Sequence, residues 1–216
     1  MSPINELRFE YSIDVVICLD ATNRNSNFNE VIKQRILSCY NEFEIESIDR
    51  DIEEFRIKII TFKNFVVNNE PIKESKFFSF KEEKEQLFKY IDNINFTNQV
   101  NDENNALEAF VTAMNSNWTQ ASHIKRHVIL LFSDSQAVEL EKHKNSEYYP
   151  KDMPKNLTEL QDLWENKMSR RAKRFFAVTP DKTINDRMVE FSNTFVLETI
   201  SEEDISSVIR LCLGGL

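Results

Sequence analysis

The stretch Tyr11–Asp20, with the sequence YSIDVVICLD, decides the fold that this chain is expected to adopt. It is rich in β-branched residues and ends in an aspartate, a pattern typical of a central parallel strand that is buried on both faces. A second apolar run, HVILLF at 127–132, is followed directly by Ser133 and Asp134. The sequence therefore predicts two central strands that each carry an aspartate at the carboxyl end.

Strand and helix patterns alternate on either side of these two runs. Further strands are predicted at 56–62, 76–80, 174–178 and 194–197, and helices at 28–43, 87–94, 105–118, 157–164, 186–191 and after Ser201. This alternation predicts the α/β class, with a Rossmann-like, mostly parallel six-stranded sheet between two layers of helices. In chain order the strands are predicted to lie 3-2-1-4-5-6, with the third antiparallel at the edge because its connection is short. We expect one domain over 1–216, with a surface insertion at about 135–155.

Glycine content excludes several classes of nucleotide-binding and hydrolytic protein. The chain has 216 residues and only two glycines, Gly214 and Gly215. Dinucleotide-binding loops, P-loops and the nucleophile elbow of α/β-hydrolases all need glycines at fixed spacing inside the fold. None of these motifs can be written in this sequence.

Charge and cysteine content indicate the expected surroundings of the protein. Lys and Arg number 27 against 36 Asp and Glu, a net charge of −9, which argues against general nucleic-acid binding. The three cysteines form no CxxC pair, which excludes a zinc ribbon and favours buried thiols in a reducing compartment. The sequence shows no signal peptide and no apolar run long enough to cross a membrane. We expect a cytoplasmic protein without nucleic-acid or membrane partners.

Two basic clusters precede apolar runs. One is Lys125-Arg126-His127, and the other extends from Arg170 to Arg174. The favoured interpretation is that these cations solvate the ends of buried strands, and the alternative is a phosphate-binding patch.

Three loops carry a resemblance to a known family. The first is Asp20-Ala21-Thr22-Asn23-Arg24, the second is NDENNALEA at 101–109, and the third is LLFSDS at 130–135. Together they resemble the metal-ion-dependent adhesion site of von Willebrand factor type A (vWA) domains, and the resemblance extends over essentially the whole chain. The segments MP at 153–154, LTELQDLW at 157–164 and AKRFFAV at 172–178 are similar to one bacterial branch, associated with tellurium-resistance and vWA–ATPase–phosphatase systems.

The resemblance implies a binding module rather than an enzyme. Its implied partner is a protein, such as an ATPase or another component of a bacterial stress or defence system. The implied metal-binding residues are Asp20, Thr22, Asp102 and Asp134, and together with Arg24 they form the implied partner-binding face. No catalytic residue is implied.

Arg24 is a departure from the family pattern that bears on the metal. It stands where the family has a serine whose oxygen would bind Mg²⁺, and a guanidinium cannot ligate a cation. The sequence therefore favours a degenerate, metal-free site in which Arg24 neutralises the aspartates, and the alternative is weak Mg²⁺ binding. A Mg²⁺-dependent hydrolase or phosphatase that uses Asp20 and Asp134 is the enzymatic alternative.

Overall fold

A computed structural model gives the fold of the chain. It describes residues 10–23, 26–47, 52–66, 70–98, 103–120, 122–198 and 202–213. All structural statements below concern these residues. Ser201, the predicted cap of the last helix, and Gly214-Gly215 lie outside them.

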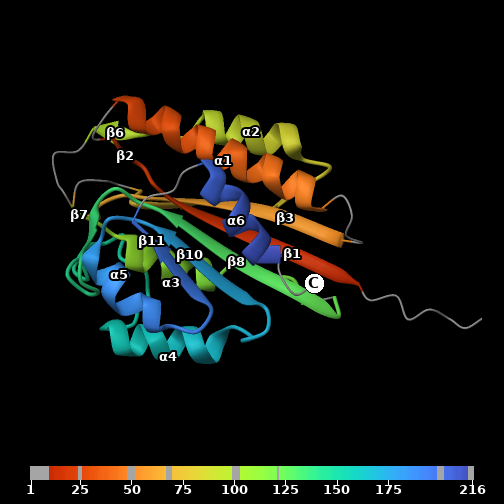
Figure 1. Cartoon of the computed structure of the whole chain (residues 1–216). Helices are drawn as coiled ribbons and strands as arrows, with labels where there is room; N and C mark the ends of the chain where they lie inside the picture. Colours follow the sequence, from red (N-terminus) through yellow and green to blue (C-terminus); the bar gives the residue numbers. More distant parts are fainter. Residues whose placement is uncertain are drawn as a thin grey trace, which may run out of the picture.

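One mostly parallel sheet forms the centre of the molecule (Figure 1). Its strand order is β11-β10-β8-β1-β3-β4, and β5 also pairs with β3. The strands are β1 (Tyr11–Asp20), β3 (Ile52–Phe62), β4 (Ile72–Glu74), β5 (Phe78–Ser79), β8 (Ile124–Phe132), β10 (Lys173–Val178) and β11 (Thr194–Leu197). Pairing is parallel except where β4 and β5 meet β3. The predicted fold class and strand order are thereby confirmed.

Several predicted elements have different bounds in the structure, among them the helix predicted at 186–191, which is a helix at Lys182–Arg187 followed by a 3₁₀ turn at Met188–Glu190. Two further differences have an identifiable cause. The strand predicted at 76–80 is reduced to β5, and β4, which precedes that segment, adds a seventh strand to the predicted six. The two are separate because the Ser75 hydroxyl accepts the Ile59 N–H at 2.9 Å and so replaces a backbone acceptor between them. The helix predicted to reach residue 118 ends at Met114. Beyond it, the Trp118 indole donates to the Met114 carbonyl at 3.2 Å, where a continuing helix would have placed a backbone N–H.

Helices cover both faces of the sheet (Figure 1). One face carries α1 (Ser26–Ser47), α2 (Lys84–Asp92) and α6 (Glu202–Leu213), whose apolar side chains share a core with alternate residues of β1. The other carries α3 (Ala106–Met114), α4 (Leu157–Lys167), α5 (Lys182–Arg187) and the 3₁₀ turn η1 (Met188–Glu190). Two layers of helices on one sheet are the arrangement that the alternating sequence pattern predicts.

The alternation of β1 decides on which face its acidic residues lie. Ile13, Val15, Ile17 and Leu19 belong to the core beneath α1 and α6. Val16 and Cys18 belong to the core beneath α3, so the even-numbered Asp14 and Asp20 face the same side. Asp14 lies near the amino end of β1 and Asp20 at its carboxyl end.

Two pairs of very short strands lie next to the carboxyl end of β1. β2 (Thr22–Asn23) pairs with β6 (Thr97–Asn98), and β7 (Glu103–Asn104) pairs with β9 (Gln136–Ala137). The β7–β9 pair joins the second and third loops of the predicted site.

The predicted surface insertion follows β9 and runs without helix or strand from 138 to 156, all of which the structure describes. It is anchored by buried Val138 and Leu140 and by a hydrogen bond from Tyr149 Oη to Glu108. None of the helices in the described part of the chain is long and apolar enough to cross a lipid bilayer.

Candidate functional site

Asp20 is the centre of a buried polar cluster at the carboxyl end of β1. Its side chain is fully buried, and its two carboxylate oxygens accept five hydrogen bonds. Oδ1 accepts from the backbone N–H and the hydroxyl of Thr22, at 3.0 and 2.5 Å. Oδ2 accepts from Asn104, Ser133 and Ser135, at 2.5, 3.2 and 2.9 Å. We call these five residues the Asp20 cluster; all the donors are electrically neutral.

Asn104 is held in a fixed orientation within the Asp20 cluster. Its Oδ1 accepts the N–H of Ala106 at 3.1 Å, at the start of α3. Because that contact requires the oxygen, the amide nitrogen faces the other way, where it donates to Asp20 Oδ2 and to Ser133 Oγ at 2.7 Å. The helix start thereby decides that Asp20 meets an N–H group and not an oxygen.

Ser135 connects Asp20 to Asp134. Its Oγ lies 2.9 Å from Asp20 Oδ2 and 3.2 Å from Asp134 Oδ1. A hydroxyl has one proton, so it donates to one of these carboxylates at a time. Asp134 itself is partly exposed, whereas Asp20 is not. The cluster therefore reaches the surface through Asp134.

The structure brings together three of the predicted site residues: Asp20, Thr22 and Asp134. Arg24 and Asp102 lie outside the described residues, and so does the predicted contact between Arg24 and the aspartates. Sequence reasoning missed Asn104, Ser133 and Ser135. Ser133 and Ser135 flank Asp134 in the third loop, and Asn104 lies directly before Asn105, the N-cap residue of α3, so their places in the chain were available signals.

In the described part of the Asp20 cluster, the Asp20 carboxylate has no position left for a directly bound Mg²⁺. Mg²⁺ takes oxygen ligands in near-octahedral geometry. Here the amide nitrogen of Asn104 lies 2.5 Å from Asp20 Oδ2, and hydroxyl and N–H donors satisfy the remaining carboxylate positions. The described residues also contain no group of three or more His, Cys, Asp or Glu side chains placed to hold a metal ion.

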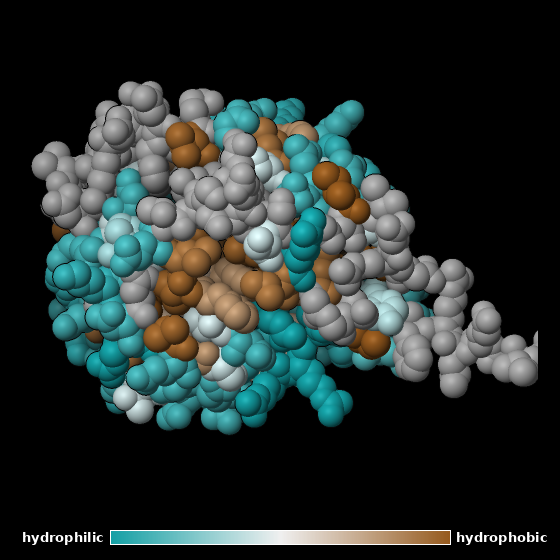
Figure 2. Space-filling model, in the orientation of Figure 1, coloured by the Kyte–Doolittle hydropathy of each residue, from teal (hydrophilic) through white to brown (hydrophobic). Residues whose placement is uncertain are grey.

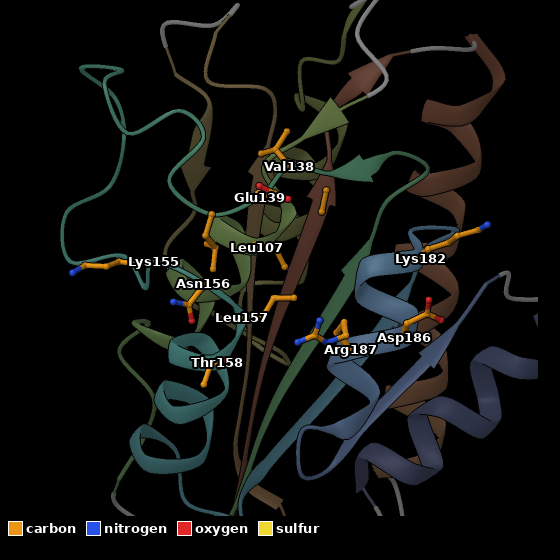
Figure 3. Close-up of a pocket in the computed structure, with 12 residues that line it drawn as sticks. Leu107, Val138, Glu139, Lys155, Asn156, Leu157, Thr158, Lys182, Asp186 and Arg187 are labelled. Carbon is orange, nitrogen blue, oxygen red and sulfur yellow. The ribbon is translucent and has the colours of Figure 1, made fainter.

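A groove of about 630 Å³ lies beside the Asp20 cluster, between α3, the segment after β9, α4 and α5. Leu107 and Leu157 contribute its apolar floor, and Glu139, Lys155, Lys182, Asp186 and Arg187 contribute charged groups. In Figure 3 Arg187 extends from α5 toward the middle of the groove, while Lys155 and Lys182 extend outward on opposite sides. The groove can accept an apolar side chain flanked by charged ones.

Glu108 lies in the first turn of α3, and it is a second buried carboxylate near this end of the sheet. Its Oε1 accepts from Tyr149 Oη at 3.2 Å, and Oε2 has no hydrogen-bond partner among the described residues. Burial raises the pKa of Glu108 to about 7. Burial also raises the pKa of Tyr149 to about 12, so its hydroxyl stays protonated near neutral pH and donates the hydrogen bond to Glu108.

Comparison with known proteins gives similarity of fold. No family model and no curated protein sequence matches the chain. Among solved structures, the pilus adhesin SpaC from Lactobacillus rhamnosus GG in its open conformation superposes with a TM-score of 0.59 at 9% identity, over 93% of this chain and 29% of the adhesin. A second form of SpaC gives 0.58 at 9% identity, over 93% and 30%.

Proximal thread matrix protein 1 from the mussel byssus gives a TM-score of 0.49 at 12% identity, over 94% of this chain and 45% of that one. The chain thus spans less than half the length of each of these structures. At such low identity, the similarity to SpaC concerns the fold alone.

Proposed function

We propose that this protein is a vWA-like interaction module that binds a protein partner at the carboxyl-end face of its sheet. That face comprises the Asp20 cluster, partly exposed Asp134 and the adjacent groove. In open α/β sheets, ligands bind beyond the carboxyl ends of the central strands. The resemblance in the three loops supports the vWA assignment, and the likeness to SpaC supports only the fold on which that assignment depends.

The groove is the observation that carries this proposal. Its volume of about 630 Å³ lies in the range of recognised ligand pockets, and an apolar floor within a charged rim resembles the usual anatomy of an interface, an apolar centre with a polar periphery. Arg187 adds a side-chain type that is enriched among energetically dominant interface residues. A protein partner that inserts an apolar residue over Leu157 and places a carboxylate near Arg187 would fit this surface.

We further propose that the Asp20 cluster shapes this face without a metal ion. In a metal-dependent adhesion site a partner carboxylate would complete the coordination of the ion. Here neutral donors already satisfy the carboxylate of Asp20, so the cluster acts by fixing the first and third loops and the start of α3. Partner binding should accordingly persist in the presence of a chelator.

The identity of the partner stays a prediction from the resemblance: an ATPase or another component of a bacterial multi-protein stress or defence system, in the cytoplasm. The enzymatic alternative is a Mg²⁺-dependent hydrolase built on Asp20 and Asp134. The full burial of Asp20 and the use of both its oxygens argue against that alternative, because a substrate would have to displace several internal hydrogen bonds. Hydrolysis of generic phosphate esters by wild-type protein, absent from Asp20→Ala, would favour the enzyme instead.

Site-specific photocrosslinking tests the proposed face. A photoreactive amino acid replaces Thr158, which is exposed and lines the groove, or Glu82, which is exposed and lies away from it. We expect a partner adduct from position 158 in cells and none from position 82. The adduct should disappear when Arg187→Glu is added and remain when the distant Lys81→Glu is added.

Two results would contradict the proposal. Equal crosslinking from both positions would show that the groove does not select the partner. Crosslinking that is lost on metal chelation would show that a metal ion completes the site.

A further inference from the structure

β11 is an uncharged strand at the edge of the sheet. It is the last strand of the sheet, next to β10, and its four residues, Thr-Phe-Val-Leu, include neither a charged residue nor a proline. β4 at the opposite edge is different, because it contains Lys73 and Glu74 and follows Pro71. Charged residues and prolines commonly protect a sheet edge against the addition of a further strand. Of the two edges, only β4 has them.

Exposed apolar side chains lie along the β11 edge. Phe195 is 41% exposed, although its ring stacks on that of Phe176 with 4.8 Å between the ring centres. Val189, in the 3₁₀ turn η1 that contacts β11, is 53% exposed. Figure 2 shows apolar surface where Figure 1 places β11, between α5 and α6. The described chain therefore leaves apolar surface uncovered at the same edge that lacks charges.

Half of the backbone groups of β11 point away from the sheet. The Leu197 carbonyl accepts the N–H of Thr179 at 2.9 Å, and the Asn193 carbonyl likewise accepts an N–H of β10. Backbone groups of successive residues face opposite sides of a strand, so those of Thr194 and Val196 point outward. Among the described residues, no group donates to or accepts from them. The N–H and C=O groups of these two residues are therefore available to a further strand.

We infer that β11 pairs antiparallel with β11 of a second copy of this chain, about a two-fold axis at Phe195. In this register Thr194 of each copy lies opposite Val196 of the other, and each such pair exchanges two backbone hydrogen bonds. The two Phe195 residues form the central non-hydrogen-bonded pair, the type of pair in which opposite side chains lie closest. The outward groups are symmetric about one residue, and a two-fold dimer requires a self-complementary surface of this kind.

Charges at the two ends of β11 suit the same arrangement. Glu198 follows β11 directly and is exposed. Arg170 is exposed as well and lies beside the amino end of β11, where its carbonyl accepts from the Asn193 side chain at 2.6 Å. Within the described chain neither Glu198 nor Arg170 forms an ion pair, whereas nearby Glu165 is already paired with Lys173 at 2.9 Å. Antiparallel pairing brings Glu198 of each copy to the end at which the other copy holds Arg170, a complementarity that an unrelated strand need not offer.

Sedimentation equilibrium and disulfide trapping of the full chain test the inference. Wild-type protein should show a concentration-dependent equilibrium between monomer and dimer. Phe195→Cys should form a disulfide-linked dimer under mild oxidation, because opposite Cβ atoms in such a pair lie about 4.5 Å apart. Tyr148→Cys is the matched control, since Tyr148 is exposed to the same extent, 42%, but lies in the surface insertion; it should form far less linked dimer. The three native cysteines are buried and do not compete.

Phe195→Lys tests the same pairing without a crosslink. Two lysines opposite each other repel, and the contact between the two rings is lost. We expect the dissociation constant of the dimer to rise about tenfold or more, while Tyr148→Lys leaves it within about twofold. Circular dichroism of both variants should match wild type.

Three results would overturn the inference. One is wild-type protein that stays monomeric up to about 100 µM. Another is equal trapping of Phe195→Cys and Tyr148→Cys, because random collision and not a fixed register would then join the copies. The third is a photoreactive residue at position 195 that forms adducts in cells only with a different protein, which would assign the β11 edge to a foreign strand.

Discussion

Two fully buried aspartates on the same face of β1 are accommodated in opposite ways. Asp14 receives the Nε and Nη2 groups of Arg56 at 2.8 and 2.7 Å, and the Thr119 N–H at 2.7 Å. Asp20, six residues further along, receives five hydrogen bonds from neutral groups. At the amino end of the strand, Asp14 forms an ion pair with Arg56. At the carboxyl end, Asp20 accepts hydrogen bonds from neutral groups only.

This difference indicates separate roles for the two ends. At Asp14 the ion pair raises the pKa of Arg56, and the guanidinium also lies 4.6 Å from the ring centre of Phe77, so cation and carboxylate form one packed unit. At Asp20 every contact joins a loop of the carboxyl-end face. Glu108 is a third buried carboxylate and the least well hydrogen-bonded of the three. Tyr149 donates to one of its oxygens, and its other oxygen has no hydrogen-bond partner among the described residues. Isosteric amides at these three positions should therefore have graded effects.

The largest effect is expected at Asp14. Asp14→Asn leaves the Arg56 guanidinium partly buried without its counter-charge, and should lower the free energy of unfolding by on the order of 3 kcal/mol. Urea denaturation measures the change. Addition of Arg56→Met should recover part of the loss; if the double variant loses the sum of both single changes, the ion pair is not the stabilising unit.

A smaller loss is expected at Asp20. Asp20→Asn keeps the shape but places an N–H₂ group against the donors on one side, so we expect a loss of about 2 kcal/mol. The same denaturation experiment applies. Amide hydrogen exchange should increase at Thr22 and Ala106, whose N–H groups belong to the network. Unchanged stability would mean that the network does not depend on the carboxylate.

At Glu108, unlike at Asp14 and Asp20, replacement of the carboxylate by an amide is expected to stabilise the protein at neutral and higher pH. Its folded pKa of about 7 lies above the ordinary 4.5, so its contribution is most favourable below pH 4.5, where the carboxyl is protonated in both states. As pH rises from 4.5 through 7, the unfolded state ionises first and wild-type stability falls, by on the order of 3 kcal/mol. Glu108→Gln should match wild type near pH 4 and be more stable near pH 8. Urea denaturation at a series of pH values measures this difference. If the free energies of unfolding of the two proteins changed in parallel with pH, the raised pKa could not belong to Glu108.

Much of the fold was predictable because its signals are local. The alternation and length of the apolar runs predict β1, β8 and the helices, and the short connection after β3 predicts an antiparallel edge. The division of that edge into β4 and β5 depends on the hydroxyl of Ser75, and the end of α3 on the indole of Trp118. Both are single side-chain contacts that hydrophobic periodicity does not report.

The candidate site was less predictable for a related reason. The aspartates at strand ends and the nearby Thr22 were visible, but the other three partners of Asp20 lie 84, 113 and 115 positions away in the chain. Asn104 looks like an ordinary residue before a helix until its amide is seen to face Asp20.

The thermal midpoint of wild-type protein in millimolar Mg²⁺, compared with the midpoint in chelator, tests the central claim that neutral donors complete the Asp20 cluster. Asn104→Asp serves as the comparison, because it replaces the N–H₂ group with a second carboxylate beside Asp20 while keeping an acceptor for the Ala106 N–H. We expect no shift for wild type and a rise with added Mg²⁺ for Asn104→Asp, by mass action. A wild-type midpoint that rises with Mg²⁺ and falls with chelator would contradict the account.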